Sequence, residues 1–198
     1  MKTELVKLTE DTKISVTEDT QYVIDFSELT SQDLNNLSLT LIFEKQGVSA
    51  QIIGVYKLHG NTAVKLTTVT DHKVPNTSCI TRIKGVLLDS AKSEYIGKIL
   101  IEKPAQQTSS FLEDNVLLLG EGCKNNSQPI LEIEADDVKA SHGATTGRID
   151  QSQIYYLTSR GLNVAEAEAL IVEGFFESLT KEINDAKIRE KVASLVKN

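Results

Sequence analysis

Apolar and polar residues alternate along most of the first two-thirds of the chain. The alternation is clear in Tyr22–Phe26, Leu37–Phe43 and Val48–Leu58, and shorter runs of the same kind continue as far as Val138. A period of two places every second side chain on one face, which is the pattern of a half-buried strand. Turn-like pieces rich in Gly, Asn, Asp or Ser separate the runs at intervals of roughly ten residues. Many short strands at that spacing predict a sandwich, a barrel or a β-solenoid.

The period changes after Asp150, where we expect the chain to become helical. Ile154 and Leu157 lie three residues apart, as they would on one face of a helix. Between the strands and this helix lies Ala140–Gly147, a run of small residues that includes His142. This run is expected to be a flexible, glycine-rich joint that leaves the imidazole accessible.

Two consecutive helices are predicted from the residues at their ends. Asp150 followed by Gln153, and Asn163 followed by Glu166, have the spacing of capping boxes. Gly161, between them, suits the left-handed residue that ends a helix. The sequence therefore predicts a helical hairpin with its elbow at Gly161.

A third, amphipathic helix is expected over Lys181–Lys197, where apolar residues recur with helical spacing. The expected organisation is a β-rich core over residues 1–148, followed by a C-terminal helical segment over residues 149–198. A chain of 198 residues is long enough for one well-filled core with a helical appendage.

Composition narrows the function class. The net charge of −7 argues against nucleic acid as a partner, because binding phosphates needs a basic surface. No apolar run approaches the length of a membrane span, and the first residues lack the apolar core of a signal peptide, so we expect no membrane contact and a cytoplasmic location. Aromatic residues make up 5% of the chain and Trp is absent, so the inward positions are mostly Val, Ile, Leu and Ala. Residues of that size stack well in the flat layers of a solenoid, although no strict sequence repeat is present.

The two cysteines, Cys79 and Cys123, are too few for a disulfide framework and have no zinc-site spacing. Cys123 lies in a glycine-rich turn beside Lys124, where we expect an exposed thiol whose thiolate form is favoured. It is the better candidate of the two for sulfur chemistry. A packing role with no chemistry remains the alternative for each cysteine.

Two other motifs carry no chemistry. Asp136 and Asp137 are adjacent, so on a strand their carboxylates point to opposite faces, and we interpret them as a charged turn. The run Gly143–Gly147 precedes a helix but lacks the Lys of a phosphate-binding loop. Nucleotide binding is therefore not expected.

The C-terminal part carries a long family resemblance. Residues 135–150 read ADDVKASHGATTGRID, and they are followed by IYYLTSRGL and by a helix that ends in GFF. This stretch closely resembles the C-terminal signature of the SufB/SufD family, whose members belong to the iron–sulfur cluster assembly machinery. The resemblance extends upstream through Pro75–Leu119, whereas residues 1–53 have no assigned counterpart.

The resemblance implies a fold and a branch of the family. SufB and SufD cores are right-handed β-helices followed by a helical C-terminal portion, so a mainly β fold of this kind is expected here. Full-length members carry an additional, largely helical N-terminal region, and this chain resembles a short form that lacks it. The SufB branch has a cysteine just ahead of the run that here reads Asn115–Leu119, but Ser109–Asp114 contains no thiol.

The resemblance also implies a role for His142. In SufD-like members the matching histidine belongs to the proposed cluster-building site, which makes His142 the candidate metal ligand, with Cys123 as a second cluster-assembly candidate. The SufD pattern has a cysteine where this chain has Ala140, and the SufB pattern has a glutamate where it has Gly143. The chain is thus nearer SufD. No tightly bound cofactor is expected, only a transient iron–sulfur cluster in the assembled complex. A turn histidine bonded to a carbonyl is the alternative.

Two partners follow from the resemblance. The C-terminal helices of the family dock onto SufC, an ABC-type ATPase subunit, so the predicted partner-binding residues are those of the hairpin: Tyr155, Tyr156, Arg160, Gly161 and Leu162. Aromatic residues and arginine are typical of interface centres. The alternative is that these side chains pack the hairpin onto the β-core. The second expected partner is a SufB-like paralogue, or a second copy of this chain, bound through the β-helix.

The expected function is that of a SufD-like scaffold, not an enzyme by itself, that works with a SufC-like ATPase. Two alternatives remain open. One is a structural interaction protein with a degenerate cluster site, which the missing cysteines favour. The other, less favoured, is a β-solenoid carbohydrate-active enzyme, since Trp platforms and paired acids are absent.

Overall fold

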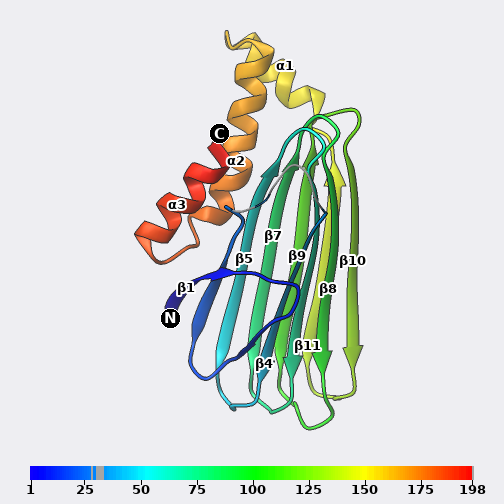
Figure 1. Cartoon of the computed structure of the whole chain (residues 1–198), viewed down its shortest axis with the longest axis vertical. Coiled ribbons are helices and arrows are strands. Elements are labelled where there is room, and N and C mark those ends of the chain that lie inside the picture. Colours follow the sequence, from blue (N-terminus) through cyan, green and yellow to red (C-terminus); the bar gives the residue numbers. More distant parts are fainter. Residues whose placement is uncertain (28, 30–33, 198) are drawn as a thin grey trace.

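The computed structural model describes residues 1–27, 29 and 34–197 (Figure 1). Strands come first along the chain and helices last. The strands are β1 (Lys2–Lys7), β2 (Thr12–Ser15), β3 (Thr20–Asp25), β4 (Leu34–Phe43), β5 (Ser49–Leu58), β6 (Ala63–His72), β7 (Ser78–Leu87), β8 (Lys92–Ile101), β9 (Ser109–Leu118), β10 (Lys124–Ile133) and β11 (Lys139–Gly147). The helices are α1 (Gln151–Ser159), α2 (Val164–Thr180) and α3 (Ala186–Lys197).

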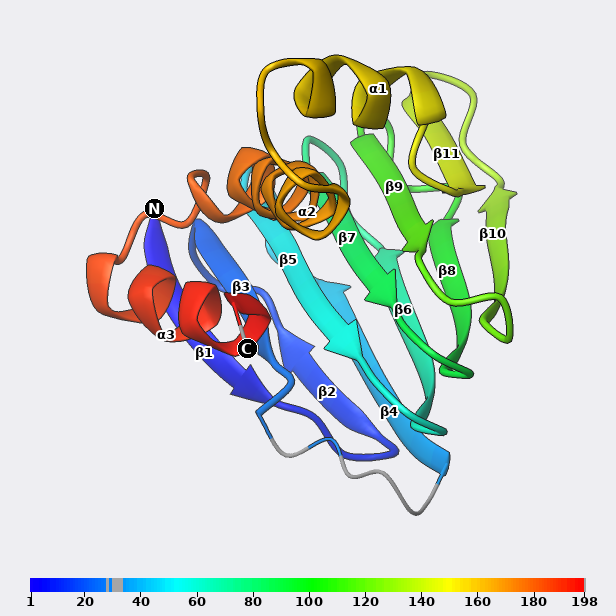
Figure 2. The same ribbon diagram turned by 90° about the horizontal axis from the view of Figure 1, so that it is seen from above.

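Consecutive strands alternate between two parallel sheets. The odd-numbered strands form one sheet in the order β1-β3-β5-β7-β9-β11, and the even-numbered strands form the other in the order β10-β8-β6-β4-β2. The two layers face each other, as Figure 2 shows from above. Each pair of consecutive strands is therefore one coil of a solenoid, and the predicted β-helix is confirmed. Between β5 and β10 the strands follow one another with no helix, as the unbroken period of two predicts.

The interior is a stack of aligned side chains. Ala50, Cys79 and Ser110 occupy the same place in successive coils of the odd sheet, and so do Ile52, Thr81 and Leu112 in the next row. Burial alternates strictly along β6, β8 and most of β9, because every second side chain points inward. The first coils, built from residues that the sequence resemblance left unassigned, continue the same stack.

Two tyrosines cross this interior where glycines leave room for them. A Cβ atom at Gly85 would overlap the ring of Tyr56, and one at Gly97 would lie 2.8 Å from the hydroxyl oxygen of Tyr95. Both rings are buried, and the Tyr95 hydroxyl bonds to Thr68 Oγ1 at 2.7 Å. The core therefore depends on Gly85 and Gly97 for the volume that the two rings fill.

A second core joins the helices to the outer face of the odd sheet. Its strand members are Val23, Ile53, Val55 and Val86. Its other members, from α2, α3 and the turn between them, are Val172, Phe176, Leu179, Ile183, Val192 and Val196. Because β5 has helices on one side and the solenoid interior on the other, its side chains are buried on both faces along Ile52–Tyr56. Among the described residues, no helix lies on the outer face of the even sheet (Figure 2).

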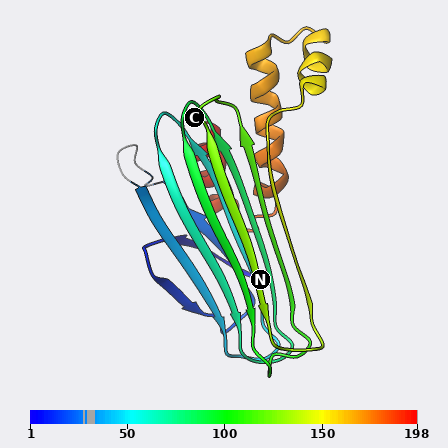
Figure 3. The same cartoon turned by 90° about the vertical axis from the view of Figure 1, so that its right-hand side faces the viewer.

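Polar contacts fix the turn between α2 and α3 on the sheet. The amide nitrogen of Gln21 donates to the backbone oxygen of Glu182 at 2.8 Å, and that of Gln51 donates to the Glu182 carboxylate at 3.0 Å. Arg82 forms an ion pair with the same carboxylate. Further along, Lys191 pairs with the buried carboxylate of Asp25 at 2.8 Å. These bonds hold α3 and the end of α2, while α1 and the start of α2 project beyond the strands (Figure 3).

Three local expectations are wrong. Ala140–Gly147 is not a flexible joint but lies in strand β11, because its backbone pairs in register with β9 from Lys139 to Gly147. Cys123 is not exposed but buried, since the preceding coil lies directly against its turn. The last helix begins at Ala186, after a turn, and not at Lys181. In the first two cases the deciding contact comes from a residue distant in the sequence, whereas the start of α3 is capped locally by Asp185, which accepts from the backbone N–H groups of Lys187 and Ile188.

Candidate functional site

The β-helix is open at its last coil, which consists of β10 and β11. Each of these strands is the terminal strand of its sheet and has a neighbour on one side only within the described residues. The register continues the inward rows, so His142 stacks on Leu112 and Ala144 stacks on Asp114. Side chains at positions that are interior in the earlier coils are therefore exposed at this end.

His142 lies at the centre of β11, and its side chain is exposed. It belongs to the inward row, because its register partner Leu112 is buried. Within the part of the chain that the structure describes, no hydrogen bond or ion pair holds the imidazole. The alternative of a turn histidine bonded to a carbonyl is therefore not what the structure shows.

The β10 side of the opening is partly polar and partly apolar. The hydroxyl of Ser93 donates to Asn125 Oδ1 at 2.6 Å, and Asn125 Nδ2 donates to Thr146 Oγ1 at 2.7 Å. This chain of bonds ties the start of β10 to the end of β11. At the other end of the strand, Ile133 is 40% exposed although it continues an inward row. An exposed continuation of a core row is a surface that another protein can cover.

Asp114 lies one coil below the opening, and the sequence analysis missed it. Its side chain is fully buried, and neither carboxylate oxygen has a hydrogen-bond partner among the described residues; the same holds for Ser127 Oγ. Burial raises the pKa of Asp114 to about 6. The sequence did contain a signal, because Leu112, Asp114 and Val116 alternate with period two and the acid occupies an inward place.

The two cysteines do not join His142. Cys79 is buried inside the odd sheet, and burial raises the pKa of its thiol to about 12. Cys123 Sγ lies 3.6 Å from the backbone oxygen of Asp89, in the turn before β10. That turn is near Thr146, and four residues of strand separate Thr146 from His142, roughly 13 Å. His142 and Cys123 therefore do not form one ligand set within this chain.

The helical hairpin is built from the capping residues that the sequence indicated. The Asp150 carboxylate accepts from the backbone N–H of Ser152 at 2.8 Å and not from that of Gln153, so Asp150 caps α1 without the expected capping box. Asn163 and Glu166 form a complete capping box at the start of α2. Gly161, between the helices, has a φ of +100°, the left-handed conformation that favours glycine. These caps fix the sharp turn between α1 and α2.

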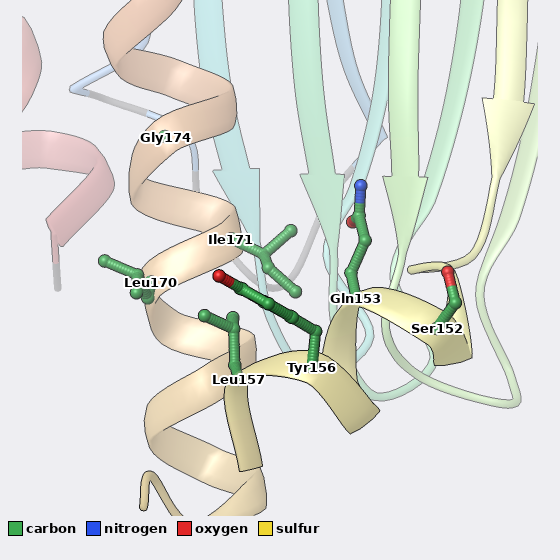
Figure 4. Close-up of a pocket in the computed structure, with 7 residues that line it drawn as sticks. All are labelled: Ser152, Gln153, Tyr156, Leu157, Leu170, Ile171 and Gly174. Atoms are coloured by element: carbon green, nitrogen blue, oxygen red, sulfur yellow. The ribbon is translucent and has the colours of Figure 1, made fainter. Parts of the chain in front are cut away.

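The hairpin presents an apolar groove between α1 and α2 (Figure 4). The groove has a volume of about 510 Å³. It is lined by Ser152, Gln153, Tyr156, Leu157, Leu170, Ile171 and Gly174. The ring of Tyr156 extends toward Leu170 on α2, and the Arg160 guanidinium lies 5.2 Å from the centre of that ring. Tyr155 and Tyr156 are 76% and 57% exposed, so neither packs onto the β-core.

The open coil and the grooved hairpin together define a class of protein. In the described ranges, no three His, Cys, Asp or Glu side chains are grouped so as to hold a metal ion, and no helix has the length and apolarity needed to cross a membrane. The exposed features are instead strand edges and an apolar helical groove. The molecule has the surfaces of a β-helical scaffold that binds other proteins.

Comparison with known proteins identifies the family. The family model described as "SUF system FeS cluster assembly, SufBD core domain" matches residues 5–175. The chain belongs to the SufB/SufD family of the SUF system for iron–sulfur cluster assembly and is nearer SufD. The match includes the N-terminal coils, well upstream of the stretch in which the sequence resemblance was found.

Individual relatives are similar over different lengths. The chain is 38% identical over 113 residues to the iron–sulfur cluster assembly protein SufD of Escherichia coli, covering 57% of this chain and 27% of that protein. It is 38% identical over 112 residues to SufD of Bacillus subtilis, covering 57% and 26%. It is 30% identical over 174 residues to a SufBD family protein of Mycobacterium tuberculosis, covering 84% and 44%. The chain therefore spans less than half the length of these relatives.

Proposed function

We propose that the chain is a SufD-like scaffold of iron–sulfur cluster assembly that has no catalytic activity of its own. It pairs with a SufB-like paralogue, or with a second copy of itself, through the last coil, and it binds a SufC-like ABC ATPase through the α1–α2 hairpin. This work takes place in the cytoplasm, as the sequence led us to expect. The observation that carries the proposal is the unpaired edge of β11 with the exposed His142 at its centre.

Unpaired strand edges favour pairing with another protein. Backbone donors and acceptors along a free edge are a template for a further strand, and such edges are a liability unless they are covered. β11 offers nine residues of free edge and contains no proline. β10 contains Pro129, which cannot donate to a ladder. We therefore place the main pairing contact on β11.

His142 enters the proposal as a ligand for the cluster, which is the cargo of the system. An imidazole binds iron through a ring nitrogen, and that of His142 is exposed and unbonded among the described residues. One imidazole does not hold a cluster, so the other ligands must come from the partner across the opening. This explains why the chain's own cysteines need not lie beside His142.

The hairpin is the proposed docking surface for the ATPase. Its groove is apolar, its rim includes exposed aromatic rings, and Arg160 lies at the elbow. Aromatic side chains and arginine contribute most of the binding energy at many interfaces. The hairpin projects beyond the strands, so a large partner reaches it without contacting the solenoid (Figure 3).

Co-expression with the SufB-like and SufC-like proteins of the same genome tests the proposal. We expect a stable complex that carries a cluster after anaerobic reconstitution. Tyr156→Ala should weaken binding of the ATPase but not of the paralogue, whereas His142→Gln should keep both partners and lose the cluster. Failure to bind either partner would refute the proposal.

A degenerate scaffold remains the second candidate, because the chain has Ala140 where a soft ligand is expected and Cys123 is buried. A degenerate scaffold would form the same complex, but its cluster content would not depend on His142. If His142→Gln leaves the cluster content of the complex unchanged, the chain is an interaction subunit only.

A further inference from the structure

The fold contains a buried carboxyl group that forms no hydrogen bond of normal length among the described residues. Asp114 points into the β-helix from β9 and is fully buried, and both of its oxygens lack a hydrogen-bond partner among the described residues. The hydroxyl oxygen of Ser127, from the opposite sheet, is buried and unpartnered as well. An ionised carboxylate in such a place is costly, because it loses its hydration and the nearby Ser127 hydroxyl offsets only part of that loss.

Only the terminal coil separates Asp114 from solvent at the open end. Ala144 of β11 is its register partner and is itself exposed. The inward row of β11 is Ala140, His142, Ala144 and Thr146, whereas the row beneath it in β9 contains Leu112 and Val116. The terminal coil thus contributes fewer apolar contacts than the coils below it. Local opening is easiest where buried apolar contacts are few.

We propose that the terminal coil formed by β10 and β11 is a proton-sensitive cover, closed when the Asp114 carboxyl is protonated and loosened when it is ionised. Lifting the coil hydrates the carboxylate and relieves the cost of burying its charge. Protonation removes that charge, so the coil lies stably over a neutral acid. The inference does not depend on the proposed partners, since it concerns the chain alone.

The groups that face Asp114 do not supply a counter-charge. Tyr95 lies across the interior on β8, Tyr56 extends from β5 of the same sheet past Gly85, and Cys79 lies on the neighbouring strand β7. Burial raises the pKa of all three, so they stay neutral in the working range. His142 is the titratable group on the inward face of β11, one row away from the Ala144 row. The remaining inward residues of β7, β8 and β10 next to Asp114 carry no charge.

The expected size of the effect follows from the two states of the carboxyl. In the open coil the group titrates near its ordinary value of 3.8, and in the closed coil burial raises the pKa to about 6. Opening is therefore favoured as pH rises through this window, and the opening constant should increase about 25-fold between about pH 4.5 and about pH 7.5. Because β11 carries His142 and the free edge, the same proton controls how ordered that edge is.

Hydrogen exchange measured by mass spectrometry on the full chain tests this inference. After correction for the intrinsic pH dependence of amide exchange, peptides from residues 124–147 should lose about 25-fold of protection over that range, while peptides from β5 to β7 should not change. Asp114→Asn should abolish the pH dependence, and Asp114→Ala serves the same purpose if the amide variant folds poorly. Asp71→Asn, which removes a carboxyl on the outer face of the even sheet, is the matched control and should behave like the wild type.

Three outcomes would overturn the inference. His142→Gln should keep the pH dependence; if it abolishes the effect, the histidine is the titrating group and the inference is wrong. Equal pH dependence in Asp114→Asn and the wild type would also overturn it. Protection at about pH 7.5 that appears with added Mg²⁺ and requires Asp114 would replace the proton by a metal ion and refute the inference.

Discussion

The stability of the β-helix should depend on pH through two buried groups that act in opposite directions. His72 is fully buried, stacks on Phe43 with ring centres 4.3 Å apart, and bonds through Nδ1 to Thr77 Oγ1 at 2.8 Å. Burial lowers the pKa of its imidazole from 6.5 to about 4. Burial raises the pKa of Asp114 from 3.8 to about 6.

The sign for each group follows from which state binds the proton. The unfolded chain protonates His72 below 6.5 while the native state does not, so acid should remove about 3 kcal/mol of stability between pH 6.5 and 4. The native state holds a proton on Asp114 that the unfolded chain loses above 3.8, so Asp114 should remove about 3 kcal/mol as pH rises from 3.8 to 6. In the wild type the two effects largely cancel.

Asp114→Asn separates the two groups. Relative to the wild type, the variant should be more stable by up to about 3 kcal/mol at neutral pH, and the difference should fall toward zero near pH 4. Unlike the wild type, the variant should lose stability steeply on acidification, because the effect of His72 is no longer cancelled by that of Asp114. His72→Gln should show the reverse trend, because its stability relative to the wild type should increase as pH falls.

Urea unfolding at a series of pH values from about 4 to about 7 measures these differences, with Asp71→Asn as the control whose difference from the wild type stays constant. Other ionisable groups, such as the Asp25–Lys191 pair, contribute the same background to every variant. If the difference between Asp114→Asn and the wild type stays flat within about 0.5 kcal/mol over the range, the reasoning on buried charge is wrong.

Further predictions concern packing and docking. Gly85→Ala should destabilise the fold by about 1–3 kcal/mol, because the added methyl overlaps the buried ring of Tyr56. Gly143→Ala is the control: no atom lies within 4 Å of the added carbon, so stability in thermal melts should change by less than about 0.5 kcal/mol. Tyr156→Ala and Arg160→Ala should each alter stability by less than about 1 kcal/mol and weaken binding of a SufC-like ATPase by about 1–3 kcal/mol in a titration. Variants that melt far below the wild type but bind the ATPase equally well would show that the hairpin residues serve packing.

Sequence patterns predicted the structural features that depend on residues close together in the chain. The period of two identified the strands, because in a β-helix one face of every strand is buried. The caps at Asp150 and Asn163 were visible, because a cap bonds within three residues of itself. The left-handed residue at Gly161 is local in the same sense. Family resemblance was needed to choose the solenoid over a sandwich or barrel.

The errors concern contacts between coils. Ala140–Gly147 has the composition of a loop, and only pairing with a strand about thirty residues earlier makes it β11. Cys123 has the local context of an exposed turn, and its burial depends on Asp89 in the coil beneath. Neither stacking partner is visible in the residues around the position itself. A solenoid without a strict sequence repeat hides these partners from any local analysis.

The same argument explains why the proposed site of this chain lies at its last coil. In the earlier coils, the next coil covers the inward row, so the row is mostly apolar or hydrogen-bonded, as it is around His72, with Asp114 as an exception. In the described residues no further coil follows the last one, and its inward row is free to carry small and polar residues such as His142 and Thr146. A partner that adds a further strand to β11 would bury this row and enclose His142 between the partner and the coil that contains Asp114. The last coil is therefore an end of the described stack at which an inward position such as His142 is exposed and accessible to a partner.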